Sequence, residues 1–133
     1  MRIMVDANIV VSAILFPKSV VTRAFSHLID NHNLVLSKYT IDEIKDVFKE
    51  KFPHRIIEME EFMEKTPYEL FILNKFDNKK YPSIRDIDDL PVLANAIDSE
   101  VDLLITGDRD FDDVIVERPK IINPRVYINE YIG

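Results

Sequence analysis

Short apolar runs alternate with amphipathic stretches along the whole chain. Runs of strand length occupy residues 2–6, 32–37, 68–73, 101–106 and 120–122. Apolar side chains recur at helical spacing in residues 7–15, 19–31, 40–51, 54–65 and 89–99, and a last helical turn follows Pro124. The segment 74–85 is polar and basic, which predicts a loop.

This alternation of strands and helices predicts an α/β fold. Helices that connect parallel strands cover both faces of a sheet, so we expect a three-layer α/β/α domain with a central, mostly parallel sheet. The right-handed crossover rule limits the possible topologies but does not fix the strand order. The chain has no internal repeat and no low-complexity linker, and we expect residues 1–133 to form a single domain.

Four acidic side chains stand where predicted strands end or predicted helices begin. They are Asp6, Glu43, Asp89 and Asp108. In a parallel sheet, the carboxyl ends of the strands and the adjoining helix N-termini share one edge, which is where such folds bind ligands. Carboxylates gathered there repel one another unless protons or hard cations bind. The sequence therefore favours a divalent metal site at this edge.

Asp6 directly follows a buried apolar run. Its alternative role is to cap the helix that starts at residue 7, because Asp is a favoured N-cap residue. Asn8 lies two residues on and can orient the Asp6 carboxylate or a bound water. Ser12 lies one helical turn beyond Asn8, where it can face the same cleft.

Glu43 also has two explanations. Thr40 and Glu43 have the spacing of a capping box, in which each side chain binds the backbone amide of the other residue. The neighbouring Asp42 is a second candidate for the cleft. We choose Glu43 because it borders the apolar face marked by Ile44 and Phe48, whereas Asp42 lies farther from that face.

Three acids, Asp86, Asp88 and Asp89, stand just before a predicted helix with Pro91 in its first turn. One of Asp88 and Asp89 is expected to be the N-cap, and acids there also suit the helix dipole. Capping accounts for any one of them but not for all three.

Gly107 separates the strand-like run that ends at Thr106 from Asp108 and Asp110. A glycine here permits a tight turn or the close approach of a ligand, and both acids are then expected in the strand-end region. Asp and Gly are also ordinary turn residues. The metal site is favoured because four such acidic positions meet at one predicted edge.

The composition narrows the chemistry. There is no cysteine, which excludes disulfides and thiolate metal sites, and no histidine cluster that would suggest zinc. Mg²⁺ and Mn²⁺ prefer oxygen ligands, acidify bound water and neutralise phosphoryl oxygens, so metal-assisted phosphodiester chemistry is the leading hypothesis. Seventeen Lys and Arg against 24 Asp and Glu give a net charge of −7. This charge opposes binding to a polyanion unless bound cations cancel part of it.

The apolar segments are short. None approaches the roughly 18 residues that a membrane span needs, and no basic leader followed by a long apolar run is apparent. The chain is 47% hydrophobic, which is enough for a sizeable core. We therefore expect a soluble, cytoplasmic protein without membrane contact.

Four segments together resemble the PIN-domain family, especially the VapC-like toxins of type II toxin–antitoxin pairs. They are residues 3–13, 36–44, 85–96 and 103–111, and the last two are the most specific. Their order and spacing match the family, and together they extend over nearly the whole chain. The resemblance implies a five-stranded parallel sheet flanked by helices, often a homodimer, and a small antitoxin partner that blocks the site.

The resemblance also implies a Mg²⁺- or Mn²⁺-dependent endoribonuclease. The family's catalytic and metal-binding acids correspond to Asp6, Glu43, Asp89 and Asp108. Its accessory polar positions correspond to Asn8, Thr106 and Asp110. On this basis Asp6 and Asp89 are the expected central ligands, and a metal-activated water is expected to cleave RNA phosphodiester bonds, leaving 5′-phosphate and 3′-hydroxyl ends.

Four basic residues lie near the expected cleft in the sequence and are candidates for binding the RNA substrate: Arg85, Arg109, Lys79 and Lys80. A solvated loop is the alternative explanation for them. Two other functions stay open. One is a catalytically weak or inactive PIN-like module that acts through protein binding. The other is a phospho-acceptor signalling domain, which ranks third because Asn123 follows the last strand where such a domain needs a lysine.

Overall fold

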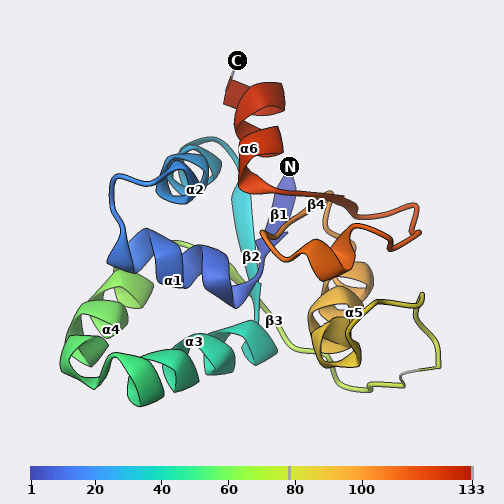
Figure 1. The fold of residues 1–133 in the computed structure, drawn as a ribbon, viewed down its shortest axis with the longest axis horizontal. Coiled ribbons are helices and arrows are strands. Elements are labelled where there is room, and N and C mark those ends of the chain that lie inside the picture. Colours follow the sequence, from blue (N-terminus) through green and yellow to red (C-terminus); the bar gives the residue numbers. More distant parts are fainter. Residues whose placement is uncertain (78, 133) are drawn as a thin grey trace.

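A five-stranded parallel sheet forms the centre of the computed structural model, which describes residues 1–77 and 79–132 (Figure 1). The strand order is β3-β2-β1-β4-β5, and all four neighbouring pairs are parallel. The strands are β1 (Arg2–Val5), β2 (Asn33–Ser37), β3 (Glu69–Phe71), β4 (Leu103–Ile105) and β5 (Lys120–Ile122).

Helices connect the strands and cover both faces of the sheet. They are α1 (Ala7–Leu15), α2 (Val20–Asn31), α3 (Lys38–Lys51), α4 (Ile56–Lys65), α5 (Leu90–Asp98) and α6 (Pro124–Tyr127). Single turns of 3₁₀-helix occur at η1 (Pro53–Arg55), η2 (Ile87–Asp89) and η3 (Arg109–Phe111), and a π-helical segment η4 (Ile128–Ile132) continues α6.

Alternate residues of each strand belong to two separate cores, as the period of two in a strand requires. Ile3 and Val5 pack into the larger core, with α1, α2, α3, α4 and α6. Met4 packs into the smaller core with Leu93 and Ala96 of α5. Figure 1 shows α5 across the sheet from α1, α3 and α4. The predicted three-layer α/β/α class with a parallel sheet is confirmed.

The chain reverses its direction of travel across the sheet at β1. It passes outward from β1 to β2 and β3, and then returns to the other side of β1 to form β4 and β5. Connections therefore leave β1 and β4 in opposite directions, and such a switch point opens a crevice at the carboxyl ends of the strands. Val5 pairs with Ile105, which brings Asp6 and Thr106 together at that crevice.

The first turn of α3 corrects one sequence prediction. The helix begins at Lys38, not at Thr40, and Ser37 is its N-cap: Thr40 N donates to Ser37 Oγ at 3.0 Å. The predicted Thr40–Glu43 capping box is therefore wrong. Thr40 lies inside the helix, fully buried, and Glu43 is free of a capping role. Ser37 ends a buried strand, so it can cap the helix with no intervening loop.

The start of α5 differs from its prediction in a similar way. Asp89 occupies the N-cap position, one of the two expected, but its side chain makes no capping hydrogen bond. Asp86 caps the preceding turn instead, because its Oδ1 accepts from Asp88 N at 2.9 Å. Asp89, the first residue of the predicted helix, is instead the last residue of the 3₁₀ turn η2, and its carboxyl is left available.

Two strands are shorter than their apolar runs. The run 68–73 is paired only at Glu69–Phe71, and the run 101–106 only at Leu103–Ile105. β3 is an edge strand that pairs with β2 alone, so the residues beyond that short ladder have no partner strand. Apolarity predicts burial, but the length of a strand depends on its neighbour.

Arg2 connects several segments of the chain at the amino-terminal edge of the sheet. Its Nη1 donates to Ser99 O at 2.6 Å, its Nη2 pairs with Glu69 at 2.5 Å, and its backbone amide donates to Asp102 Oδ2 at 2.9 Å. Arg118 also reaches Asp102, at 3.2 Å. These contacts join β1, the start of β3 and the segment around β4 at the edge opposite the acidic residues.

Among the described residues, no single helix is long and apolar enough to cross a membrane. Helices α1 and α2 meet the criteria of length and composition only as a pair, and that pair is bent by 106°. Buried side chains of both helices belong to the larger core.

Candidate metal centre

Asp6 lies at the carboxyl end of β1 with 7% of its surface exposed. Its Oδ1 accepts from Ile9 N at 3.2 Å, so it caps α1, and its Oδ2 accepts a hydrogen bond from the Thr106 hydroxyl. Burial raises the pKa of Asp6 above its ordinary value. The hydrogen bonds from Thr106 and Ile9 oppose that rise, and the carboxyl of Asp108 adds to it. Capping and a role in the site are therefore compatible at this residue.

Asp108 is held by a tight turn after β4. Its backbone amide donates to Thr106 Oγ1 at 3.0 Å, and its Oδ1 accepts from Asp110 N at 2.8 Å. Thr106 is 4% exposed, and its hydroxyl links the Asp6 carboxyl to the amide of Asp108. Gly107 has no atom within 4 Å of where a Cβ would lie, so open space adjoins the turn.

Asp89, at the N-cap of α5, lies near Asp108. Burial and the nearby carboxyls of Asp108, Asp86 and Asp110 together raise the pKa of Asp89 to about 7. Its Oδ2 is buried and has no hydrogen-bond partner among the residues that the structure describes. A buried, unpaired carboxyl oxygen is costly unless a proton or a cation binds to it.

Glu43 comes from the first turns of α3. Burial raises the pKa of Glu43, and the carboxyls of Asp6 and Asp46 add to the rise. Glu43 is half-buried, whereas Asp42 is exposed and forms an ion pair with Lys38 at 2.8 Å. Of the two neighbours, Glu43 is therefore the one whose charge acts on Asp6.

The structure also brings one acid, Asp86, into the site that the sequence had not placed there. One carboxyl oxygen each from Asp86, Asp89 and Asp110 lies within 4.8 Å of the others, a spacing that can hold a metal ion. Of the four acids predicted as ligands, Asp89 is the one that belongs to this group. The three acids before α5 were the available signal, but which of them faces the site depends on the turn η2.

Tyr39 is a second neighbour that sequence reasoning missed. Burial raises the pKa of its phenol, and the acids Glu43, Asp89 and Asp88 raise it further. The tyrosine precedes Glu43 by one helical turn on α3, so it stands beside the acids without being charged itself.

The predicted accessory residues differ in their exposure and in their contacts with the acids. Asn8 is exposed in the first turn of α1, and Ser12 is half-buried one turn farther on. Arg85 pairs with Asp113 at 2.5 Å and lies 3.9 Å from Asp110. Their roles stay predictions.

The remaining predicted cations are solvent-facing. The side chain of Arg109 is 89% exposed and pairs with Asp112 at 3.6 Å. Lys79 and Lys80 are exposed in the loop that precedes α5. Arg85 is thus the predicted cation with an ion pair to an acid of the cluster.

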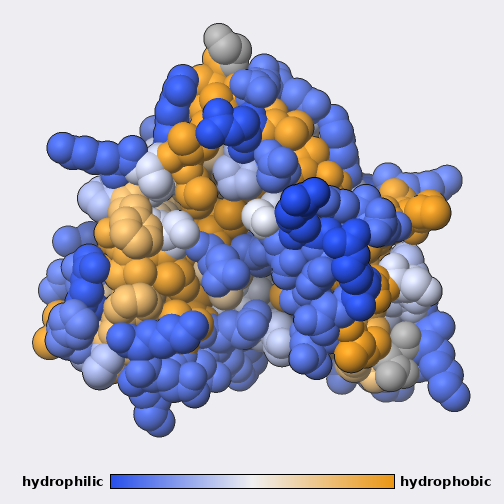
Figure 2. All heavy atoms as spheres, viewed as in Figure 1, coloured by the Kyte–Doolittle hydropathy of each residue, from blue (hydrophilic) through white to orange (hydrophobic). Residues whose placement is uncertain are grey.

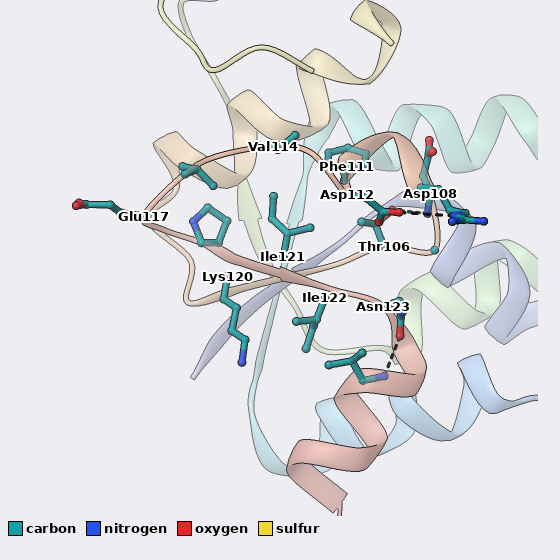
Figure 3. A pocket seen from close by; sticks show the side chains of 15 residues that line it. Thr106, Asp108, Phe111, Asp112, Val114, Glu117, Lys120, Ile121, Ile122 and Asn123 are labelled. Atoms are coloured by element: carbon teal, nitrogen blue, oxygen red, sulfur yellow. Dashed lines mark hydrogen bonds and ion pairs between the residues drawn. The ribbon is translucent and has the colours of Figure 1, made fainter. Parts of the chain in front are cut away.

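A pocket of about 1020 Å³ opens beside the acids, between β5 and the segment that follows β4. Figure 3 shows Thr106 and Asp108 at one end, Ile121 and Phe111 between, and Glu117 at the other end. Figure 2 shows strongly hydrophilic side chains gathered over the segment between β4 and β5 in the view of Figure 1. Asp108 is the candidate acid that lines this pocket, so the pocket gives solvent access to its end of the cluster.

The donor set suits a hard divalent cation. All the candidate ligand atoms are carboxylate oxygens, and Mg²⁺ and Mn²⁺ prefer oxygen ligands. Burial is the main cause of the raised pKa values of Asp6, Glu43 and Asp89, and neighbouring carboxyls add to each rise, so positive charge would be favourable here. The unpaired Oδ2 of Asp89 is an oxygen that a cation would satisfy.

A family model described as a PIN domain matches residues 2–110. This chain belongs to the PIN domain family. The match includes the candidate metal ligands, so they lie within the region that defines the family: Asp6, Glu43, Asp86, Asp89, Asp108 and Asp110. No curated protein has a sequence that matches this PIN domain significantly.

The fold of this PIN domain is also found in solved structures. One chain in the crystal structure of VapBC2 from Rickettsia felis, bound to a DNA fragment from their promoter, aligns with a TM-score of 0.69 and 18% sequence identity. The alignment covers 92% of this chain and 98% of that chain. At that identity the likeness establishes the shared fold.

Proposed function

We propose that this PIN domain is a Mg²⁺- or Mn²⁺-dependent endoribonuclease and the toxin of a toxin–antitoxin pair. The proposal is supported by charge effects between neighbouring acids near the switch point of the sheet: Asp6 acts on Glu43, and Asp108 acts on Asp6 and on Asp89. Asp86, Asp89 and Asp110 offer oxygens at a spacing that suits a metal ion, and Asp6, Glu43 and Asp108 would complete the site. When bound, the cation would neutralise phosphodiester charge and acidify water.

The residues of the chain have separate tasks in this proposal. The Thr106 hydroxyl orients the Asp6 carboxylate and favours its ionised form, which partly offsets the effect of burial on its pKa. Asp89 has a pKa of about 7, so it is partly protonated at neutral pH, and a bound cation would displace that proton. Asp108 is fixed by its turn, so its carboxyl needs little reorganisation to bind.

The same comparison supports the proposal of a protein partner. The aligned chain belongs to a VapBC2 structure, and a PIN-domain toxin with an antitoxin is the assembly that we propose here. An antitoxin that covers the acidic edge would block substrate, and a homodimer would place two such sites in one assembly.

The experiment is cleavage of mixed structured and single-stranded RNAs in Mn²⁺, Mg²⁺ or EDTA. Wild type is compared with Asp6→Ala and Asp89→Ala, and with Asp30→Ala on the exposed side of α2 as the matched control. We expect metal-dependent cuts in wild type and Asp30→Ala, and a loss of at least about a hundredfold in both site variants.

Two outcomes would contradict the proposal. Cleavage that survives unchanged in Asp6→Ala and Asp89→Ala would come from a contaminant. Metal binding in calorimetry without cleavage of any RNA would favour a PIN domain that acts through protein binding.

A further inference from the structure

A second, smaller pocket lies next to the candidate metal centre, between α3, α5 and the segment that follows β3. Its volume is about 300 Å³. Aromatic and aliphatic side chains form most of its wall: Tyr39, Ile72, Leu73, Phe76 and Pro91. The polar lining consists of the Asn95 amide and the ion pair of Lys38 with Asp42.

The pocket and the acids are built on the same two helices. On α3, Tyr39 faces the pocket, and Glu43 one turn later acts on Asp6. On α5, Asp89 stands at the N-cap, and Pro91 follows in the first turn as a wall of the pocket. The phenol of Tyr39 is close enough to Glu43 and Asp89 for their charges to raise its pKa, after the larger effect of burial. A group bound in the pocket would therefore adjoin a phosphate bound at the acids.

Two aromatic side chains of the pocket, Tyr39 and Phe76, are partly exposed to solvent. Phe76 is 50% exposed, yet its ring is stacked on Tyr81 with centroids 5.9 Å apart and an interplanar angle of 16°. Tyr81 is held in turn by a hydrogen bond of 2.8 Å to Asp98 Oδ2. Tyr39 is 37% exposed. Exposed rings that neighbouring side chains hold in place are the platforms on which unpaired bases stack.

One buried amide gives the pocket a polar group. Asn95 is 4% exposed, and its Nδ2 donates to Pro91 O at 2.7 Å. That bond fixes the orientation of the amide. Over the part of the chain that the structure describes, no hydrogen bond reaches Asn95 Oδ1, and this oxygen is not among the buried atoms left unpaired. It is therefore an accessible acceptor in the wall of the pocket, able to bind a donor such as the exocyclic amine of a base.

The charge of the segment that carries Phe76 favours a polyanion. Residues 74–85 have four basic side chains and one acidic one in a chain of net charge −7. In the pocket itself, Lys38 and Asp42 form an ion pair, so the lining adds no net charge. A locally basic segment that contributes an aromatic wall suits a polyanion with flat bases.

We infer that this pocket binds an unpaired nucleobase of single-stranded RNA, next to the phosphate that the acidic residues engage. This inference rests on the proposed ribonuclease function and assigns the contact with the base to Tyr39, Phe76 and Asn95. A base inside a duplex stays stacked on its neighbours and cannot enter a side pocket, whereas a loop or a free end presents its bases.

The experiment measures binding without cleavage. Fluorescence anisotropy follows a dye-labelled single-stranded oligoribonucleotide in Ca²⁺, with Tyr39→Leu and Phe76→Leu beside wild type. Leucine keeps the apolar bulk and removes the ring face. Tyr68→Leu and Phe16→Leu are the matched controls, because Tyr68 is 36% exposed and Phe16 is 60% exposed, and neither lines this pocket.

We expect each pocket variant to raise the Kd for the single strand by about 5- to 150-fold, the range for losing one stacked base. The controls should bind as wild type does. A duplex of the same sequence, and a single strand with abasic sugars, should bind wild type more weakly than the intact single strand.

Three results would overturn the inference: equal losses in pocket and control variants, equal binding of the abasic strand, or tighter binding of the duplex. Binding that depends on Tyr39 and Phe76 in a protein that never cleaves RNA would support the pocket and reject the nuclease. RNA cleavage that neither the Tyr39 nor the Phe76 substitution affects would support the nuclease and reject the pocket. Unchanged RNA binding together with loss of a protein partner in the pocket variants would assign the pocket to that partner.

Discussion

At the scale of single residues, Asp89 is an acid of the cluster with a strongly raised pKa. Its pKa is raised from an ordinary value of 3.8 to about 7, first by burial and then by Asp108. Between these two values the folded protein binds a proton that the unfolded chain has released. The stability that this proton contributes is complete below about pH 4 and is lost as the pH rises to about 7.

The prediction is a pH-dependent difference in melting temperature in EDTA. Relative to Asp89→Asn, wild type should lose thermal stability as the pH rises through this window, and added Mn²⁺ should abolish the loss. Asp30→Asn is the control, because Asp30 is exposed and distant from the cluster in the fold. If the melting temperatures of wild type and Asp89→Asn change in parallel with pH, the pKa of Asp89 is not raised in the folded protein.

Much of the acidic constellation could be predicted from the sequence, because each acid follows a strand or begins a helix. Asp86 and Tyr39 could not. Asp86 enters the cluster only because η2 turns its side chain toward Asp89 and Asp110. Tyr39 adjoins the acids only because α3 begins two residues earlier than its pattern suggested. Both depend on the geometry of a single turn, which side-chain periodicity does not encode.

At the scale of elements, the start of α3 can be tested by exchanging the two candidate caps. Ser37→Ala removes the hydroxyl that accepts from Thr40 N and should lower the free energy of unfolding by about 1 kcal/mol. Thr40→Val removes a buried hydroxyl that has no partner in the described part of the chain, so it should be neutral or stabilising. Urea unfolding of both variants gives the comparison. A large loss in Thr40→Val with none in Ser37→Ala would restore the capping box.

The order of strands and helices could be predicted, but their ends could not. The periodicity of the chain places every helix of more than one turn, because burial against a sheet requires an apolar face. The lengths of β3 and β4 depend on which strands lie beside them, and this information is absent from a local pattern. The same limit applies to the strand order, which emerges only from the complete topology.

At the scale of the whole molecule, the acidic edge should make the fold sensitive to divalent cations. We expect Mn²⁺ at about a hundredfold above its Kd to add about 2.7 kcal/mol to the free energy of unfolding. Asp6→Asn should raise the melting temperature in EDTA by a few degrees, about 1 kcal/mol, since it removes a buried charge and keeps an acceptor for Ile9 N. It should also weaken the response to Mn²⁺.

Calorimetric scans of wild type and Asp6→Asn, each with EDTA or Mn²⁺, test both expectations. Asp30→Asn again serves as the control for a charge removed elsewhere. If neither Mn²⁺ nor the Asp6 substitution moves the transition, the four acids do not share one electrostatic site.

The Arg2 contacts described above lie at the edge of the sheet opposite the acids. These contacts and the candidate acids share no side chain. We therefore expect substitutions of the acids to leave this part of the scaffold in place. The same separation would let the acidic positions vary in sequence while the sheet keeps its form.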